Sequence, residues 1–189
     1  QKAFLFPGQG AQTVNMGRDV AQALPQALEV WDFSAELDRH TNREPLHQKV
    51  FPNPVFSESD RKAQQVELTK TQWAQPAIGV ASMALLNVLD ELGVRADACA
   101  GHSYGELTAL YYAKTFNPQH FIQVSQKRGE LMNEAASIPG AMTAVKGSAK
   151  KIQPKLDTWN AAHGLDVVIA NHNSPKQSVL SGTVEDIEK

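Results

Sequence analysis

Serine 103 stands in a sequence pattern that could make it a nucleophile. Residues 101–105 read Gly-His-Ser-Tyr-Gly and fit G-x-S-x-G. The small residues from Asp97 to Gly101 predict a strand before the pattern, and Gly105 to Tyr112 predict a helix after it. A tight turn from strand to helix lifts a serine hydroxyl clear of the sheet, near helix amides that favour developing negative charge. The alternative is a glycine-rich turn with an incidental serine, because the bare pattern is common by chance.

A second glycine-bearing loop follows the apolar segment from Lys2 to Phe6, which predicts a short buried strand. Residues 7–12 read Pro-Gly-Gln-Gly-Ala-Gln. No Lys-Ser/Thr pair follows them, and the three-glycine dinucleotide spacing is absent, so the loop does not match a phosphate-binding motif. It is either an ordinary turn or the source of a backbone amide beside Ser103, which would form an oxyanion hole together with the amide of Tyr104.

Helices must position these two loops. Apolar residues at helical spacing predict helices over 71–92 and 118–136. A third helix is expected over 18–37, where Pro25 can interrupt it. The polar, proline-bearing segment 39–70 predicts a surface excursion with short helical turns, which Val50-Phe51 and Val55-Phe56 could anchor.

The pattern changes at residue 141. From there the sequence predicts a strand, a helix, two strands and the start of a helix, over 142–147, 150–162, 166–170, 177–181 and 184–189. This order is most of a ferredoxin-like unit without its last strand. We therefore predict an α/β fold in two parts, a body over 1–140 that carries the Ser103 turn and a truncated subdomain over 141–189.

Composition narrows the class of protein. The chain has 189 residues, 42% of them hydrophobic, which is typical of a globular protein. A net charge of −2 argues against a nucleic-acid partner, and the apolar stretch 77–89 is too short and too interrupted to span a membrane. The single cysteine, Cys99, suits a reducing cytoplasm. We expect no bound metal and no bound cofactor. Because the chain enters an apolar run directly after Gln1, we expect it to be a piece of a longer polypeptide.

Four motifs occur in order along nearly the whole chain: Phe-Pro-Gly-Gln-Gly-Ala-Gln at 6–12, Gly-His-Ser-Tyr-Gly-Glu at 101–106, Arg-Gly-Glu-Leu-Met at 128–132, and Ala-Asn-His-Asn-Ser-Pro at 170–175 before Ser181-Gly182. This set resembles the malonyl-CoA:acyl-carrier-protein transacylase family, the acyltransferase domains of fatty acid and polyketide synthases. The long excursion is more similar to the domains of polyunsaturated fatty acid synthases. The resemblance implies an acyltransferase fold, with an α/β-hydrolase-like parallel-sheet body and a ferredoxin-like small subdomain, both incomplete here.

The resemblance also implies roles for individual residues. Ser103 would be the acylated nucleophile, the backbone amides of Gln9 and Tyr104 the oxyanion hole, and Arg128 the ligand of the malonyl carboxylate. His102 would line the pocket, and Asn171 and Asn173 would help to shape the cleft.

Arg128 also makes sense in that role from its chemistry. A planar guanidinium with two parallel donors matches a carboxylate better than a lysine does. The alternative is a surface arginine paired with Glu130 or Glu134 on the same helix, which would contribute little in water.

A serine needs a neighbouring base to become a good nucleophile. Apart from His102, whose side chain should point away from Ser103, the histidines are His40, His47, His120, His163 and His172. The first four of these are expected to be solvated, and His172 lies in a motif that borders the cleft. The family's catalytic histidine follows the Ser-Gly strand, and no residue up to Lys189 matches it. We therefore expect that a second chain supplies the base or that the fragment lacks full activity.

The resemblance implies transfer of a malonyl or related carboxyacyl group from coenzyme A to an acyl carrier protein through a serine acyl-enzyme. The coenzyme A thioester would be the substrate, the phosphopantetheine thiol of the carrier would be the acceptor, and the chain would belong to a larger multidomain synthase. Two alternatives remain open. An α/β-hydrolase, such as a thioesterase or esterase, would need an HGG-type loop that the sequence lacks. A non-catalytic carrier- or acyl-binding domain would account for the unmatched histidine.

Overall fold

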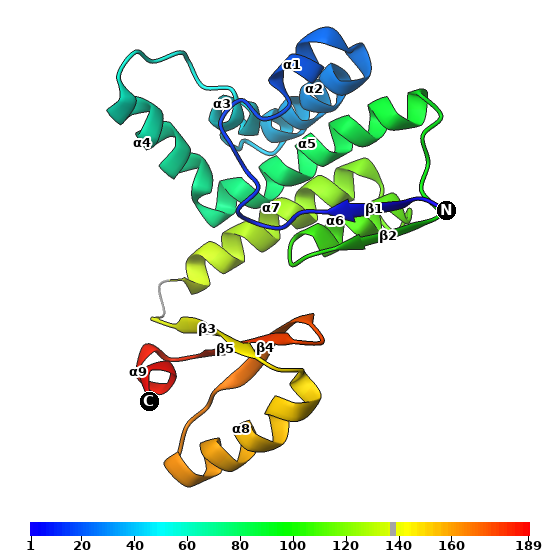
Figure 1. Cartoon of the computed structure of the whole chain (residues 1–189). Coiled ribbons are helices and arrows are strands. Elements are labelled where there is room, and N and C mark those ends of the chain that lie inside the picture. The colour runs from blue at the N-terminus through cyan, green and yellow to red at the C-terminus, as the bar shows by residue number, and fades with distance from the viewer. Residues whose placement is uncertain (137–138) are drawn as a thin grey trace. The chain divides into compact units, whose positions relative to one another are not determined.

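The computed structural model describes residues 1–136 and 139–189, which form a mixed α/β fold (Figure 1). The chain divides into two compact units, Gln1–Glu134 and Ala135–Lys189. The first unit combines a two-stranded parallel sheet with most of the helices, and the second contains a three-stranded antiparallel sheet. Each unit has a hydrophobic core of its own.

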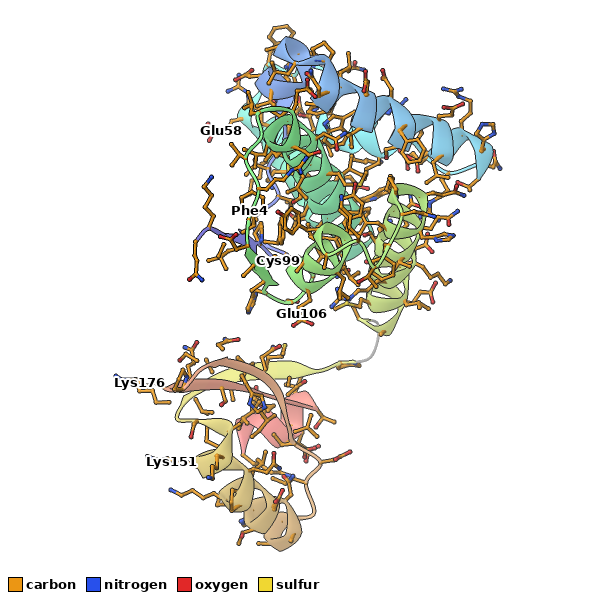
Figure 2. All side chains as sticks on the ribbon, turned by 90° about the vertical axis from the view of Figure 1, so that its right-hand side faces the viewer. Phe4, Glu58, Cys99, Glu106, Lys151 and Lys176 are labelled. Atoms are coloured by element: carbon orange, nitrogen blue, oxygen red, sulfur yellow. The ribbon has the colours of Figure 1, made fainter. Side chains whose placement is uncertain are left out.

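Two short strands organise the first unit. Strand β1, Ala3–Phe6, pairs in parallel with strand β2, Ala98–Gly101. Phe4 lies opposite Cys99, and both are marked in Figure 2. Because the strands run parallel, the loops that follow them leave from the same end of the sheet. The pairing thus brings two loops together that are about ninety residues apart in the sequence.

The described helices of the first unit are α1 (Arg18–Ala23), α2 (Pro25–His40), α3 (Leu46–Val50), α4 (Glu58–Thr69), α5 (Thr71–Glu91), α6 (Gly105–Tyr112) and α7 (Pro118–Ala135). Helix α6 packs on both strands, and α5 packs along α2 (Figure 1). The residues 74–80 of α5 are all buried, so this helix runs through the core. The predicted interruption at Pro25 is confirmed, because Leu24 has extended backbone angles and Pro25 opens α2.

The segment 39–70 differs from its prediction as a surface excursion. It contains the twelve-residue helix α4, and Leu46, Val50 and Leu68 are fully buried in the core. The buried Asp38 carboxylate holds the segment, accepting the Leu46 amide at 2.9 Å and the Gln126 side chain at 2.7 Å. The anchor expected at Val50-Phe51 is confirmed, because Val50 is buried and Phe51 packs against the core. The anchor expected at Phe56 is wrong, since that side chain is 97% exposed, and Leu46 and Leu68 take the role instead.

The second unit contains β3 (Ala141–Lys146), α8 (Ala149–His163), β4 (Val168–Ser174), β5 (Gln177–Gly182) and α9 (Val184–Glu188). This order of elements is the predicted one. Strand β5 lies between β3 and β4 and runs antiparallel to both. Leu156 of α8 packs with Leu165 and Val167 beneath the sheet. Strand β4 continues past the predicted end at Ala170, so residues 171–174 belong to a strand rather than a loop.

Within the described residues, no helix is both long and apolar enough to cross a membrane.

The buried anchor at Leu46 gives a test of the fold. Leu46→Ala should lower the free energy of unfolding by about 2–5 kcal/mol, because the side chain is 1% exposed and its loss leaves a cavity. Leu92→Ala, at a side chain that is 69% exposed, is the matched control and should change stability by less than about 0.5 kcal/mol. Urea unfolding followed by circular dichroism measures both, and equal losses would contradict the packing of α3.

Candidate active site

Ser103 lies in a strained turn between β2 and α6. Its φ of 52° is in the left-handed region that non-glycine residues rarely adopt. The His102 amide donates to the Phe6 carbonyl at 3.1 Å, and the Gly105 amide donates to the His102 carbonyl at 2.9 Å. These bonds hold the turn between the two strands and the first residue of α6. Strain of this kind is common where a side chain is held for function.

Glycines make the tight turn possible. A Cβ atom at Gly101 would overlap the backbone of Gly105, and a Cβ atom at Gly105 would overlap the carbonyl of Phe6. Helix α6 therefore begins in direct backbone contact with β1, which only glycine at both positions permits. The strand, the turn and the helix predicted around Ser103 are confirmed as structure.

The loop after β1 lies against this turn. A Cβ atom at Gly8 would come 2.6 Å from the His102 carbonyl and 3.3 Å from the Ser103 Cβ. Within residues 1–136 and 139–189, the backbone amides of Gln9 and Tyr104 donate no hydrogen bond. Amides without an internal partner in adjoining loops are the kind of donor that an oxyanion needs.

A buried glutamine that the sequence analysis missed connects this loop to Arg128. The Gln75 side chain is 1% exposed, and its Nε2 donates to Gln9 Oε1 at 3.4 Å. Its Oε1 accepts a hydrogen bond of 2.6 Å from Arg128 Nη1. Gln9 Nε2 donates in turn to Thr71 Oγ1 at 3.1 Å. The sequence does contain a sign of this role: a glutamine lies inside the apolar run of α5, and a buried amide needs hydrogen-bond partners.

Arg128 is half-buried on α7 and has a neutral partner. The alternative of an ion pair with Glu130 is not found, because Glu130 pairs with Arg43 instead and lies 3.9 Å from Lys127. No ion pair joins the Arg128 guanidinium to a carboxylate within the described part of the chain. Gln75 engages one of its five N–H groups and neutralises none of its charge, which leaves it suited to bind an anion.

Tyr104, the residue after the serine, is completely buried. Its hydroxyl lies 2.7 Å from Ser125 Oγ on α7. Burial raises the pKa of the Tyr104 hydroxyl well above its ordinary value, and the nearby Ser125 hydroxyl and Arg128 charge oppose that shift only in part. Burial thus favours the protonated form of the phenol.

Ser103 has no histidine partner within the described residues of the first unit. The Ser103 hydroxyl has no hydrogen-bond partner among the residues that the structure describes. His102 is exposed, and its Nδ1 lies against Gly8. His40 and His120 are exposed, as predicted. His47 was wrongly expected to be solvated, since it is half-buried and its Nδ1 is buried without a partner in the described chain.

Asn171 and Asn173 belong to the second unit. Both lie in β4, where Asn171 is half-buried and Asn173 is exposed. Asn173 Nδ2 donates to Gln177 Oε1 at 3.3 Å. The structure thus gathers Gln9, Ser103, Tyr104 and Arg128 in the first unit, and it describes the two asparagines within their own unit.

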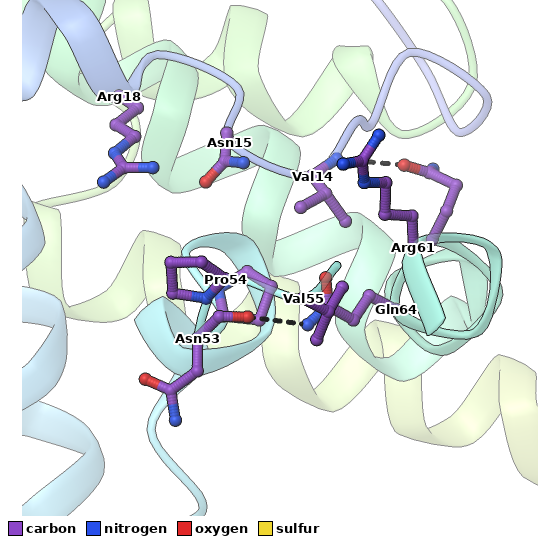
Figure 3. Close-up of a pocket in the computed structure, with 10 residues that line it drawn as sticks. Val14, Asn15, Arg18, Asn53, Pro54, Val55, Arg61 and Gln64 are labelled. Atoms are coloured by element: carbon purple, nitrogen blue, oxygen red, sulfur yellow. Dashed lines mark hydrogen bonds between the residues drawn. The ribbon is translucent and has the colours of Figure 1, made fainter. Parts of the chain in front are cut away.

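A separate pocket of about 400 Å³ lies between the loop before α1, the segment 52–55 and α4 (Figure 3). Arg18 and Arg61 line it, and a hydrogen bond of 2.9 Å from Gln64 Nε2 to the Asn53 carbonyl closes one wall. None of the predicted site residues lines this pocket. In the described part of the chain, no three His, Cys, Asp or Glu side chains gather into a possible metal site.

Comparison with known proteins identifies the family. The family model described as "Acyl transferase domain" matches residues 3–189. Malonyl CoA-acyl carrier protein transacylase of Bacillus subtilis is 36% identical over 98% of this chain, which spans 55% of that relative. The crystal structure of the transacylase of that name from Clostridium perfringens is 31% identical, with a TM-score of 0.81 over 98% of this chain and 54% of the other. A malonyl-transacylase solved in complex with a type II polyketide synthase acyl-carrier protein is 34% identical, with a TM-score of 0.75 over 98% of this chain and 56% of the other.

The chain therefore spans about half the length of these relatives, and the match includes both of its units. The matched residues 3–189 include the strained serine turn and the loop that adjoins it. They also include the antiparallel sheet of the second unit. The chain belongs to the acyltransferase family that includes the malonyl-CoA:acyl-carrier-protein transacylases and the acyltransferase domains of polyketide synthases.

Proposed function

We propose that the chain carries the nucleophile and the acyl-binding residues for transfer of a malonyl group from coenzyme A to an acyl carrier protein. One observation carries the proposal: a serine in a strained turn lies against the loop of Gln9, and the Gln9 side chain is linked through Gln75 to an arginine that has no carboxylate partner in the described chain. The turn supplies a nucleophile, and the arginine supplies a site for the free carboxylate of the acyl group.

The reaction proceeds in two steps, acylation of Ser103 and transfer of the acyl group to the carrier thiol. The Ser103 oxygen attacks the thioester carbonyl, and the amides of Gln9 and Tyr104 stabilise the oxyanion that forms. The C–S bond then breaks, and the proton from the serine leaves with the coenzyme A thiol. In the second step, the phosphopantetheine thiol of the carrier attacks the serine ester and returns a proton to Ser103.

A proton carrier is needed for both steps, and no histidine of the described chain bonds to Ser103. We place that base outside this chain, in a further segment or a second chain. The relative solved with an acyl-carrier protein supports a carrier as the acceptor.

The first test is loading of the serine. Incubation with malonyl-CoA should add one malonyl group to the chain, seen by intact mass spectrometry, and added imidazole should speed the loading because it can serve as the base. Ser103→Ala should abolish the adduct, because it removes the only proposed nucleophile. Ser59→Ala, at an exposed serine on α4, is the control and should load normally. A malonyl adduct on the Ser103→Ala protein would overturn the assignment.

The two alternative functions give other outcomes in the same experiment. Release of malonate with no lasting adduct would favour a hydrolase, because water would then be the acceptor. Binding of malonyl-CoA without adduct or release, with imidazole present, would favour a binding domain.

The second test concerns selectivity. Arg128→Ala should lower the preference for malonyl-CoA over acetyl-CoA by about ten- to a hundredfold, because a hydrogen-bonded charge pair to the carboxylate is lost. Acetyl loading should change little. Arg95→Ala, which removes an exposed arginine paired with Asp90, is the matched control. An unchanged preference in Arg128→Ala would contradict the carboxylate role.

The third test uses the partner of Arg128. Gln75→Glu should lower the malonyl preference more than Gln75→Leu does, because a carboxylate at 75 would neutralise the guanidinium and compete with the acyl group. Both changes should raise the KM for malonyl-CoA more than they lower kcat. Equal preferences in the two variants would show that Gln75 does not act through the charge of Arg128.

A further inference from the structure

Helices α5 and α7 of the first unit meet at the Tyr104 side chain. It extends from the Ser103 turn into the space between α5 and α7, and its hydroxyl reaches Ser125 Oγ on α7 at 2.7 Å. On the α5 side it contacts Gly79, where even a single Cβ atom would overlap the tyrosine hydroxyl. The space is therefore fitted to a tyrosine, and Gly79 is the residue that makes room for it.

The direction of the hydrogen bond follows from the second partner of Ser125. Ser125 Oγ donates to the Phe121 carbonyl at 2.8 Å, one turn earlier on α7. A hydroxyl has one proton to donate, so Ser125 accepts from Tyr104 rather than donating to it. Tyr104 therefore donates to Ser125 and Ser125 to the Phe121 carbonyl, which joins the turn to α7.

The same two helix faces carry the Gln75–Arg128 pair. Gln75 lies one turn before Gly79 on α5, and Arg128 lies one turn after Ser125 on α7. The contacts thus form two adjacent layers between the helices. In one layer Tyr104 fills the gap from Gly79 to Ser125, and in the next Gln75 reaches Arg128 at 2.6 Å.

A close backbone contact fixes the distance between α5 and α7 beside these two layers. Gly129, next to Arg128, is buried against the Thr71 carbonyl, where a Cβ atom would come within 2.9 Å of that oxygen. Helix α7 therefore touches α5 directly beside Arg128, and Tyr104 separates the same helices one turn further along. A change in the Tyr104 layer is therefore expected to shift α7 about this contact, and with it the Arg128 guanidinium.

We propose that the Tyr104 hydroxyl is a positioning residue for Arg128: through Ser125 it fixes the place of α7, and so the distance between the Ser103 nucleophile and the guanidinium. The effect on acyl selectivity rests on the proposed function, whereas the placement of Arg128 does not.

Placement is tested first, by a readout that needs no activity. In the full chain labelled with ¹⁵N-arginine, the Arg128 guanidinium signal is assigned from its loss in Arg128→Lys. Tyr104→Phe keeps the ring and removes only the hydroxyl, and Ser125→Ala removes the acceptor. Both should shift or broaden the Arg128 signal. Tyr112→Phe is the matched control, because it also removes a single tyrosine hydroxyl, at the other end of α6, and that hydroxyl bonds the Ala96 backbone instead of α7.

Selectivity is tested second, by loading with malonyl-CoA and acetyl-CoA. Tyr104→Phe should lower the malonyl preference about two- to tenfold through a raised KM for malonyl-CoA, as expected for the loss of one hydrogen bond. The double variant with Ser125→Ala should lower it no further, since both changes break the same bond. Tyr112→Phe should leave the preference unchanged.

The outcomes separate the two proposals. If the Arg128 signal of Tyr104→Phe has the same position and width as that of the unsubstituted chain, the positioning role is overturned. If the Arg128 signal moves in Tyr104→Phe but the acyl preference stays unchanged, the positioning role stands and the role in selectivity is overturned. If the unchanged chain loads neither acyl group, with or without imidazole, the proposed function fails, and the Arg128 signal still decides the positioning role.

Discussion

The parallel pairing of β1 with β2 is the constraint on which the site depends. It brings the ends of two short strands to one place, and there the loop of Gln9 meets the turn of Ser103. The pairing works only because Gly101 and Gly105 let the backbone of α6 touch β1. A larger side chain at either position would separate the helix from the strand, and the loop of Gln9 would move away from the Ser103 turn.

Helix α5 supplies the second half of the arrangement. It is buried along residues 74–80, and its one buried amide side chain, that of Gln75, joins the first loop to α7. A polar group in this position is stabilised only if both ends of the amide are paired. The hydrogen bonds to Gln9 and Arg128 meet that need, so the requirement to satisfy a buried group also orients the residues around Ser103.

Much of this could be read from the sequence, and the exceptions have physical reasons. The serine turn depends on local features, glycine spacing and the elements on either side, so its strand, turn and helix were predicted correctly. In the segment 39–70 the anchor at Val50 was predicted correctly, but Leu46 was missed because it is buried by contacts with distant helices. Gln75 was missed for a related reason: only the fold shows which residues a polar side chain in an apolar helix meets. The same holds for Tyr104, which the sequence places beside the serine without showing that it is buried between two helices.

The fit between Gly79 and Tyr104 has a consequence for how such chains can vary. The Tyr104 hydroxyl occupies the space that a side chain at position 79 would need. A larger residue at 79 alone would therefore clash, and a smaller residue at 104 alone would leave a void. A smaller residue at 104 is compatible with a larger one at 79, and a tyrosine at 104 demands glycine. The pair should therefore covary among related chains, and a designer who grafts this serine turn onto another acyltransferase scaffold would have to transplant position 79 of α5 together with it.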